Sequence, residues 1–270
     1  LDHHSYRSPP ALRAEARTLK ASEKEASSMV DFHGVSMPTQ IIALGGSLLR
    51  PEEEQQRAIW FGQLRQMAVH FEGNARKLGI VVGGGLPARE AISLAKESFS
   101  DSYRLDTVGI SATRLNATIL QQSLLEIGCK VSPIIPTSTT EAADLLETHS
   151  IVVMGGTTPG HTTDAVAVAL ARDCGAPHCV IATNVSHIHD SDPRTNPEAK
   201  PIEEITLSEL AQITGTEPLT PGESAAVDPI AVKWAIDANI RLAVLDGRDL
   251  SRVEDALEGR PFVGTLVKAE

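Results

Sequence analysis

IVVMGGTTPGHTTDAVA, residues 151–167, is the most informative stretch of the chain. It begins with four apolar residues, reaches two glycines, continues through small, polar and turn-forming residues, and ends amphipathic. That order predicts a buried strand, a loop and the start of a helix. The loop at 157–163 holds four threonines together with Pro159, Gly160 and His161. Hydroxyls, glycine amides and a helix N-terminus that face one crevice suit a polyanionic ligand.

Apolar strand patterns alternate with helical patterns on both sides of this stretch. Further strands are expected at 40–44, 78–82, 131–135, 179–182, 242–245 and 265–267. Helices are expected to begin at Pro51 and Pro87 and to span 103–127, 139–148, 207–213, 229–239 and 251–257, with a Gly/Pro-rich linker at 214–222. This alternation predicts a three-layer α/β/α sandwich with a mostly parallel central sheet.

Three of the expected strands end in glycine: GGS at 45–47, GGG at 83–85 and GG at 155–156. A single glycine cluster is more often a tight turn than a phosphate site. Ligands of open parallel sheets, however, bind at the carboxyl ends of the strands, where glycine permits close approach of the backbone. Neither GxxxxGK[ST] nor GxGxxG is present. We therefore expect the three clusters to lie at one rim of the sheet and to hold phosphate in another way.

Bulk composition narrows the function classes. The chain has 270 residues, 41% hydrophobic and only 3% aromatic, which suits an α/β core. A formal net charge of −11 argues against nucleic-acid or membrane-surface partners, and no apolar run is long enough to span a bilayer. An anionic ligand must then be held by local amides, helix dipoles, a few cations and a divalent metal ion. Three cysteines without CxxC spacing predict free buried thiols in the cytoplasm.

The first 36 residues differ from the rest because they mix charges, Ser, Ala and Pro with little apolar periodicity. We expect a disordered or loosely helical extension at 1–36 and one catalytic domain at 37–270. An alternative is that the natural start is Met37 or Met29. No secretory signal or acid-poor transit peptide is expected in this segment.

Six segments together resemble archaeal-type uridylate kinase, of the amino acid kinase superfamily. They are ALGGS (43–47), VVGGGLPAR (81–89), DTVGISATRLNA (106–117), VMGGTTPGHTTDAVA (153–167), IATNV (181–185) with DP (192–193), and VDPIAVK (227–233). The resemblance runs from about Ile41 to the C-terminus. It implies transfer of a phosphoryl group from ATP, with Mg²⁺, to UMP in pyrimidine nucleotide biosynthesis. It also implies a homo-oligomer, which is a hexamer in the family.

The resemblance also implies roles for single residues. The ATP side would comprise Gly46, Ser47, Gly85, Arg89, Thr183, Asn184, His189 and Asp192. The UMP side would comprise Gly84, Asp106, Thr157, Thr158, Pro159, Gly160, His161, Thr162 and Thr163. The catalytic residues would be Arg89, Asp164 and Lys233, with no metal ligand from the protein because Mg²⁺ arrives with ATP.

The chain departs from the family in two places. Members commonly read NVDGVY where this chain has NVSHIH, so Ser186, His187 and His189 replace Asp, Gly and Tyr. Thr158 stands where the family usually has His. The adenine side is therefore where differences from the family are expected.

Phosphoryl transfer passes through a loose transition state, so catalysis depends on positioning and charge stabilisation. Backbone amides at 45–47 and 83–85 are expected to hold the transferring group, while Arg89 neutralises charge on its equatorial oxygens. Asp164 would orient the surrounding cationic groups, and Lys233 would complete the positive ring.

Each of these assignments has a structural alternative. Arg89 and Lys233 could be solvated surface cations, and Asp106 and Asp164 could be helix caps. Arg114 is expected to pair with a nearby carboxylate.

The histidines are similarly open. His161 could donate to phosphate or only fix its own loop, and His187 with His189 is more often a solvated turn than a metal site.

Two other functions are compatible with the same motifs. One is a kinase for another small phosphate, such as isopentenyl phosphate, and the other is a non-catalytic anion-storage protein.

Overall fold

The computed structural model describes residues 39–49, 54–215 and 225–269. The expected extension at 1–36 and most of the expected linker at 214–222 lie outside the described residues. The helices are α2 (Glu54–Gly73), α3 (Gly85–Lys96), α4 (Ser102–Glu126), α5 (Thr139–Thr148), α6 (Thr163–Asp173), α7 (Leu207–Thr214), α8 (Pro229–Ala238) and α9 (Leu250–Leu257). The strands are β1 (Gln40–Leu44), β2 (Leu78–Val82), β3 (Ile151–Met154), β4 (His178–Thr183), β5 (Ile188–His189), β6 (Pro201–Ile202), β7 (Glu204–Thr206), β8 (Arg241–Asp246) and β9 (Thr265–Lys268).

A seven-stranded sheet with the order β3-β2-β1-β4-β8-β9-β7 forms the centre of the fold. Its strands pair in parallel except for β8 and β9, which are antiparallel. β1, β2 and β3 are buried along their whole length, so helices must cover both faces. The predicted three-layer α/β/α sandwich is therefore confirmed.

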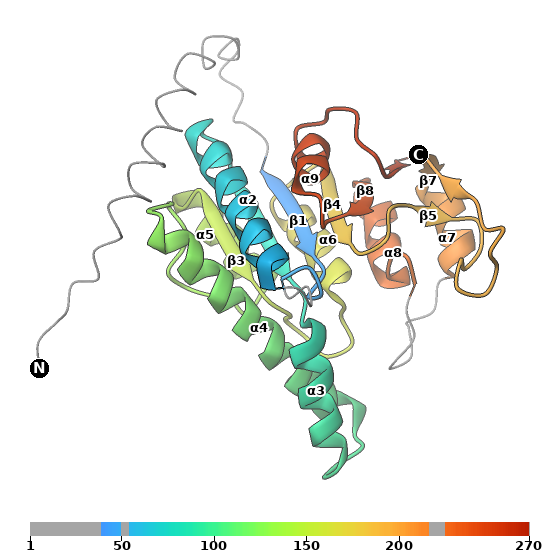
Figure 1. Cartoon of the computed structure of the whole chain (residues 1–270), viewed down its shortest axis with the longest axis horizontal. Helices are drawn as coiled ribbons and strands as arrows, with labels where there is room; N and C mark the ends of the chain where they lie inside the picture. Colours follow the sequence, from blue (N-terminus) through green and yellow to red (C-terminus); the bar gives the residue numbers. More distant parts are fainter. Residues whose placement is uncertain (1–38, 50–53, 216–224, 270) are drawn as a thin grey trace, which may run out of the picture.

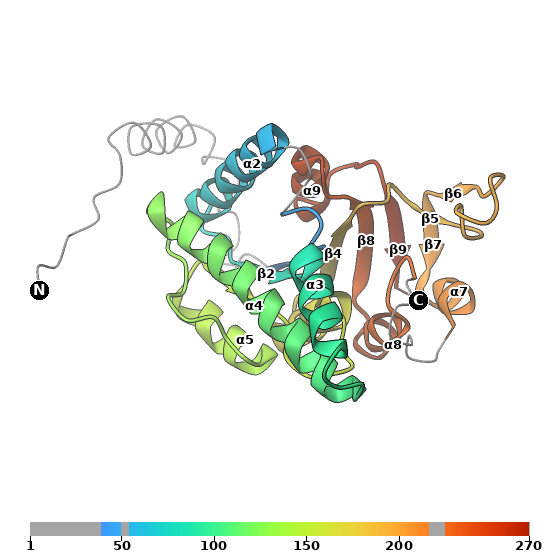
Figure 2. The same cartoon turned by 60° about the horizontal axis from the view of Figure 1, so that its bottom comes forward.

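Alternate residues of β1 point into the two halves of the core, as the two-residue repeat of a strand requires. Ile41 and Ala43 pack with α5, α6, α7 and α8, whereas Ile42 and Leu44 pack with α2, α4 and α9. Figure 2 shows the strands between the two helix layers. In the layer of α5, α6, α7 and α8, the buried face of α6 is rich in alanine, and these small side chains allow α6 to lie close against the sheet.

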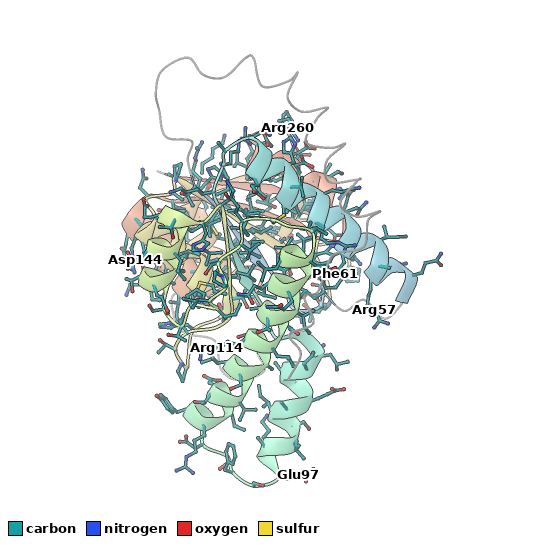
Figure 3. All side chains as sticks on the ribbon, turned by 90° about the vertical axis from the view of Figure 1, so that its left-hand side faces the viewer. Arg57, Phe61, Glu97, Arg114, Asp144 and Arg260 are labelled. Carbon is teal, nitrogen blue, oxygen red and sulfur yellow. The ribbon has the colours of Figure 1, made fainter. Side chains whose placement is uncertain are left out.

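α3 lies outside this sandwich. It has no buried residue and packs beside the first part of α4, and the two helices project together beyond the sheet (Figure 1). Figure 3 shows Glu97 at the far end of this pair, with Arg114 on the part of α4 nearer the body of the molecule. Within the described residues, no helix is both long enough and apolar enough to cross a bilayer.

Two expected elements differ in the structure. The strand expected at 131–135 is wrong: it is reduced to one bridge between Val131 and Ile151. Ser132 Oγ accepts the backbone N–H of Ile134 at 3.1 Å, and Pro133 has no N–H to donate to a ladder. The helix expected to begin at Pro87 begins two residues earlier, at Gly85.

The three cysteines are free thiols, as predicted. Cys129 and Cys179 are buried, whereas Cys174 is only partly buried. Burial raises the pKa of the Cys174 thiol to about 11, with the charge of Asp173 adding to the effect. Burial raises the pKa of Cys179 as well, so the thiols of Cys174 and Cys179 are protonated at neutral pH and chemically unreactive.

Candidate functional site

Three glycine turns, at 45–47, 83–85 and 155–156, follow the adjacent strands β1, β2 and β3 at one rim of the sheet. Two of them are in direct backbone contact. A Cβ atom on Gly46 would overlap the nitrogen of Gly85 and would lie 2.6 Å from the carbonyl carbon of Gly83. Only glycine fits at Gly46, and the backbone of the two turns forms one continuous surface.

Gly85 has a φ of +58° and is the first residue of α3, whose N-cap, Gly84, supplies no side chain to the helix end. No described side chain caps this helix end, and because Pro87 has no N–H, the N–H groups of Gly85 and Leu86 are the donors that can bind an anion beside the turn at 45–47. Arg89 lies one turn further along α3; it is exposed, and it makes no ion pair with any described residue. Ser47 is also exposed at this rim.

Asn116 holds the second glycine turn from the opposite side, and sequence reasoning gave it no role. Its fully buried side chain on α4 donates from Nδ2 to the carbonyls of Gly83 (2.8 Å) and Gly84 (3.0 Å). A polar residue on the core face of a predicted helix was the available signal, because a buried amide needs partners.

Thr113, also on α4, holds the third glycine turn. Its Oγ1 accepts the backbone N–H of Gly156 at 2.7 Å and donates to the carbonyl of Ile110 at 2.6 Å. Arg114 donates from Nε to the carbonyl of Gly156 at 3.3 Å. The expectation that Arg114 pairs with a carboxylate is wrong for the described residues, since its partner is this backbone oxygen.

The loop at 157–163, here called the threonine loop, is fixed to α4 through Asp106. Asp106 Oδ2 accepts the backbone N–H of Gly160 at 2.8 Å. The alternative that Asp106 is a helix cap is wrong, because Asp101 caps α4 by accepting the N–H of Arg104 at 3.0 Å. Thr157, Thr158 and Pro159 complete the start of this loop.

The end of the threonine loop is fixed to α8. Thr162 caps α6 by accepting the N–H of Ala165 at 3.3 Å, and its hydroxyl donates to Asp228 Oδ2. Asp228 is buried and caps α8 by accepting the N–H of Ile230 at 2.9 Å. Asp228 was missed as a site residue, although an aspartate before Pro229 at a helix start is a recognisable cap pattern.

The N-terminus of α6 reaches the second glycine turn. A Cβ atom on Gly83 would lie 3.1 Å from Thr163 Oγ1, so the N-terminus of α6 adjoins the second turn. The three turns and the threonine loop therefore lie together at one rim of the sheet, where backbone N–H groups and hydroxyls gather at two helix N-termini. Backbone N–H groups and hydroxyls at helix N-termini are suited to binding phosphate.

Asp164 lies in the first turn of α6, and Thr162, not Asp164, is the helix cap. Loss of hydration raises the pKa of Asp164 to about 6. The N–H of Asp228, which points at Asp164 Oδ2 from 3.4 Å, opposes this rise, and the negative charge of Asp228 adds to it. Asp164 is thus a partly protonated carboxylate close to neutral pH.

His161 and Lys233 differ in how they are held. The imidazole of His161 makes an edge-to-face contact with Trp234 on α8, with ring centroids 5.0 Å apart. Its backbone N–H donates to the carbonyl of Thr158 at 3.2 Å, so the contacts of His161 fix the loop. Lys233 is exposed, as its structural alternative expected, and it makes no ion pair with any described residue.

The residues expected on the ATP side fall into two groups. Thr183 ends β4 beside the first glycine turn, since a Cβ atom on Gly45 would lie 3.7 Å from its Cα, and Asn184 follows it. His189 and Asp192 instead belong to the two-stranded β5–β6 region. Asp192 is bound there by Arg194, which holds the pKa of that carboxyl below its usual range.

His187 and His189 do not form a metal centre with other side chains. In the described part of the chain, no group of three or more His, Cys, Asp and Glu side chains is arranged to hold a metal ion. Desolvation lowers the pKa of His187, which keeps its imidazole neutral at physiological pH.

Comparison with known families and structures gives consistent matches. The sequence model of the Amino acid kinase family matches residues 38–246 of the chain. A uridylate kinase from Methanospirillum hungatei is 41% identical over 232 residues, which cover 86% of this chain and 95% of that protein. A uridylate kinase from Pyrococcus abyssi is 35% identical, covering 84% of this chain and 98% of that protein.

A solved structure agrees with these sequence matches. The crystal structure of uridylate kinase from Archaeoglobus fulgidus superposes with a TM-score of 0.72 at 31% identity, covering 85% of this chain and 99% of that one. A UMP kinase from Bacillus anthracis shares the fold, with a TM-score of 0.67 at 21% identity.

Proposed function

The chain belongs to the amino acid kinase family, and we propose that it is a uridylate kinase, which transfers the γ-phosphoryl group of ATP to UMP and releases UDP and ADP. Apart from these similarities, one structural feature of the chain supports the proposal. The glycine turns of β1 and β2 touch each other and adjoin the threonine loop at the N-terminus of α6. Donor and acceptor phosphates can therefore meet over a surface of backbone amides despite the net charge of −11.

The donor phosphates are proposed to lie against the turns at 45–47 and 83–85. Amides there, including those at the N-terminus of α3, would hold the transferring group without moving during the reaction. Gly46, Ser47 and Gly85 would contact ATP, and Arg89 would place its guanidinium on the equatorial oxygens. Mg²⁺ would be carried in by ATP and would neutralise charge between its phosphates.

The acceptor is proposed to lie between α4 and the threonine loop. Gly84 and the hydroxyls of the loop would surround the phosphate of UMP, and Asp106 would hold its ribose hydroxyls. Asp106 Oδ1 accepts no hydrogen bond from any described residue, which leaves it available for a ligand hydroxyl. Asn116 and Thr113 would act indirectly, by keeping the second and third turns in place.

Asp164 and Lys233 are proposed to complete the charge arrangement around the transferring group. Asp164 lies at the start of α6, one residue after Thr163, which borders the second turn. There it would orient cations supplied by Arg89, Lys233 and the Mg²⁺ of ATP. These cations would surround the carboxylate of Asp164 and would favour its charged form once the ligands bind.

The adenine of ATP is proposed to lie beyond β4. Thr183 and Asn184, at the end of β4, would contact it first. His189 and Asp192 would contact it from the β5–β6 region.

The protein is further proposed to act in the cytoplasm, in pyrimidine nucleotide synthesis, as a homo-oligomer and specifically a hexamer. Support for self-association comes from exposed apolar side chains on the projecting α3–α4 pair. These are Leu86, Leu94, Tyr103, Leu115 and Ile119, with 41–68% of each exposed. The three free thiols support a reducing compartment.

A substrate comparison tests the proposed function. Purified full-length protein is assayed with ATP and Mg²⁺ against UMP, CMP, dUMP and isopentenyl phosphate, with ADP release coupled to NADH oxidation. UMP is expected to give the highest kcat/KM by at least tenfold. A preference for isopentenyl phosphate, or binding of UMP without any phosphoryl transfer, would contradict the proposal. Light scattering of the same preparation measures the oligomeric state.

A further inference from the structure

Three consecutive residues of the threonine loop are held by side chains from two elements, α4 and α8 with its N-cap. Gly160 is bound by Asp106 of α4, and Thr162 is bound by Asp228 at the start of α8. Between them, His161 packs against Trp234, with ring centroids 5.0 Å apart and ring planes at 84°. This is an edge-to-face pair, one of the arrangements that aromatic rings prefer.

Trp234 is anchored within the layer of α5, α6, α7 and α8, to which its own helix belongs. It is partly buried and packs against the core formed with α5, α6, α7 and α8. The guanidinium carbon of Arg172 on α6 lies 5.9 Å from the centroid of its ring, within the range of a cation–π contact.

Arg172 is fixed in turn. Its Nε donates to Asp173 Oδ1 at 3.0 Å, and Asp173 Oδ2 accepts the hydroxyl of Thr139 on α5 at 2.6 Å. The indole is therefore held by α5 and α6 through side chains that lie outside the threonine loop.

We propose that Trp234 is a positioning residue for the acceptor: by holding the ring of His161, it keeps the threonine loop in the conformation that binds the acceptor nucleotide. This inference rests on the proposed function. A loop that is already ordered loses less conformational entropy when its ligand binds, so the contact lowers the concentration of acceptor required. The contact lies on the acceptor loop and not at the donor turns, so its effect falls on UMP and not on ATP.

Steady-state kinetics of Trp234→Leu and Trp234→Phe test this role. Leucine keeps apolar volume against the core but removes the aromatic face, whereas phenylalanine keeps a ring for His161. Trp234→Leu is expected to raise KM for UMP about 3- to 10-fold, which corresponds to about 0.6–1.4 kcal/mol at 1.4 kcal/mol per tenfold. Its kcat and its KM for ATP are expected to stay within twofold, and Trp234→Phe is expected to recover most of the affinity.

Two controls separate positioning from general damage to the helix. Ile236→Ala removes a neighbouring apolar side chain of α8, 37% exposed, and is expected to leave both KM values unchanged. In a His161→Ala background, Trp234→Leu is expected to have no further effect on KM for UMP, because the ring that it positions is absent. Thermal unfolding of every variant records whether it is folded.

The inference is overturned if folded Trp234→Leu has an unchanged KM for UMP, if KM for ATP rises by the same factor, or if the effect persists without His161. Should Trp234→Leu fail to fold, the His161→Ala and Trp234→Phe variants decide the question. His161→Ala with an unchanged KM for UMP overturns the inference equally. Failure of the proposed function is distinguishable, because then the unmodified protein does not phosphorylate UMP at all.

Discussion

Asp106 on α4 accepts the backbone N–H of Gly160 at 2.8 Å, across 54 residues of sequence. This bond joins the projecting helix pair to the threonine loop. One carboxylate oxygen is used by the loop, and the other is available to a ligand. Asp106 therefore combines a structural contact with a proposed contact to the acceptor, and its removal should affect both.

Asp106→Asn should raise KM for UMP about tenfold or more while leaving KM for ATP within twofold. The amide oxygen can still accept the N–H of Gly160, but the charge that strengthens hydrogen bonds to ribose hydroxyls is lost. Steady-state kinetics with each substrate varied in turn measure both constants. Asp101→Asn removes a carboxylate from the same helix and keeps a good N-cap, so it should change neither constant. A selective loss of ATP affinity in Asp106→Asn would contradict the assignment.

Arg89→Ala should lower kcat by about 10²-fold or more with little change in stability. The guanidinium is exposed and makes no ion pair with described residues, so the folded protein loses little. The proposed transition state loses a cation that stabilises its charge. Turnover at saturating UMP and ATP, together with the melting temperature, is measured for both proteins. Lys96→Ala removes a cation from the last turn of the same helix and should leave kcat unchanged. Equal rates for Arg89→Ala and the unmodified protein would remove Arg89 from the site.

Gly46→Ala should destabilise the fold by at least about 2 kcal/mol and abolish activity in whatever protein remains folded. The added methyl would overlap the backbone of the second glycine turn, which cannot move without displacing β2 or α3. Urea denaturation gives the free energy of unfolding. Gly62→Ala, inside α2, has no atom within 4 Å of the new methyl and should stabilise the protein by about 0.5–1 kcal/mol. An active, equally stable Gly46→Ala would show that the two turns are not in contact.

The free energy of unfolding of Asp164→Asn should increase relative to that of the unmodified protein as the pH rises. The folded-state pKa of Asp164 is about 6, against 3.8 for an ordinary aspartate. Between these values the folded protein keeps a proton that the unfolded chain has released, so this group's contribution to stability falls as pH increases through the window. At pH 8 the buried, ionised carboxylate of Asp164 lowers the free energy of unfolding by at most about 3 kcal/mol, and the asparagine variant avoids this loss.

Urea denaturation at pH 5 and pH 8 measures this difference. The stability advantage of Asp164→Asn should grow by about 1–2 kcal/mol between the two pH values. Asp144→Asn, at an exposed position of α5, should show no such trend. A constant difference between Asp164→Asn and the unmodified protein at the two pH values would mean that Asp164 titrates normally.

Much of the fold followed from local sequence patterns. Short apolar runs followed by glycine, such as QIIAL and LGIVV, predicted buried strands, and the structure has β1 and β2 at the expected bounds. The run near Val131 failed because Pro133 and the Ser132 hydroxyl replace ladder hydrogen bonds with a local turn. Sequence periodicity does not report which backbone groups a side chain will satisfy.

The candidate site was only partly predictable for a related reason. Glycines at strand ends indicated the rim, because the position of a turn is a local property. Thr113, Asn116 and Asp228 were missed as site residues because their partners lie in other elements: Thr113 and Asn116 lie 43 and 33 residues from the turns that they hold. Such buried polar contacts depend on tertiary packing, which one sequence does not display.

The position of β9 in the sheet constrains how the protein can be made. β9 lies between β8 and β7, and β7 pairs with no strand other than β9 in the described sheet. During synthesis, β7 leaves the ribosome about 60 residues before β9 and must wait with both edges unpaired. Nascent chains halted before Thr265 should therefore hold a protease-sensitive segment around Glu204–Thr206, even where β1 to β4 have already assembled.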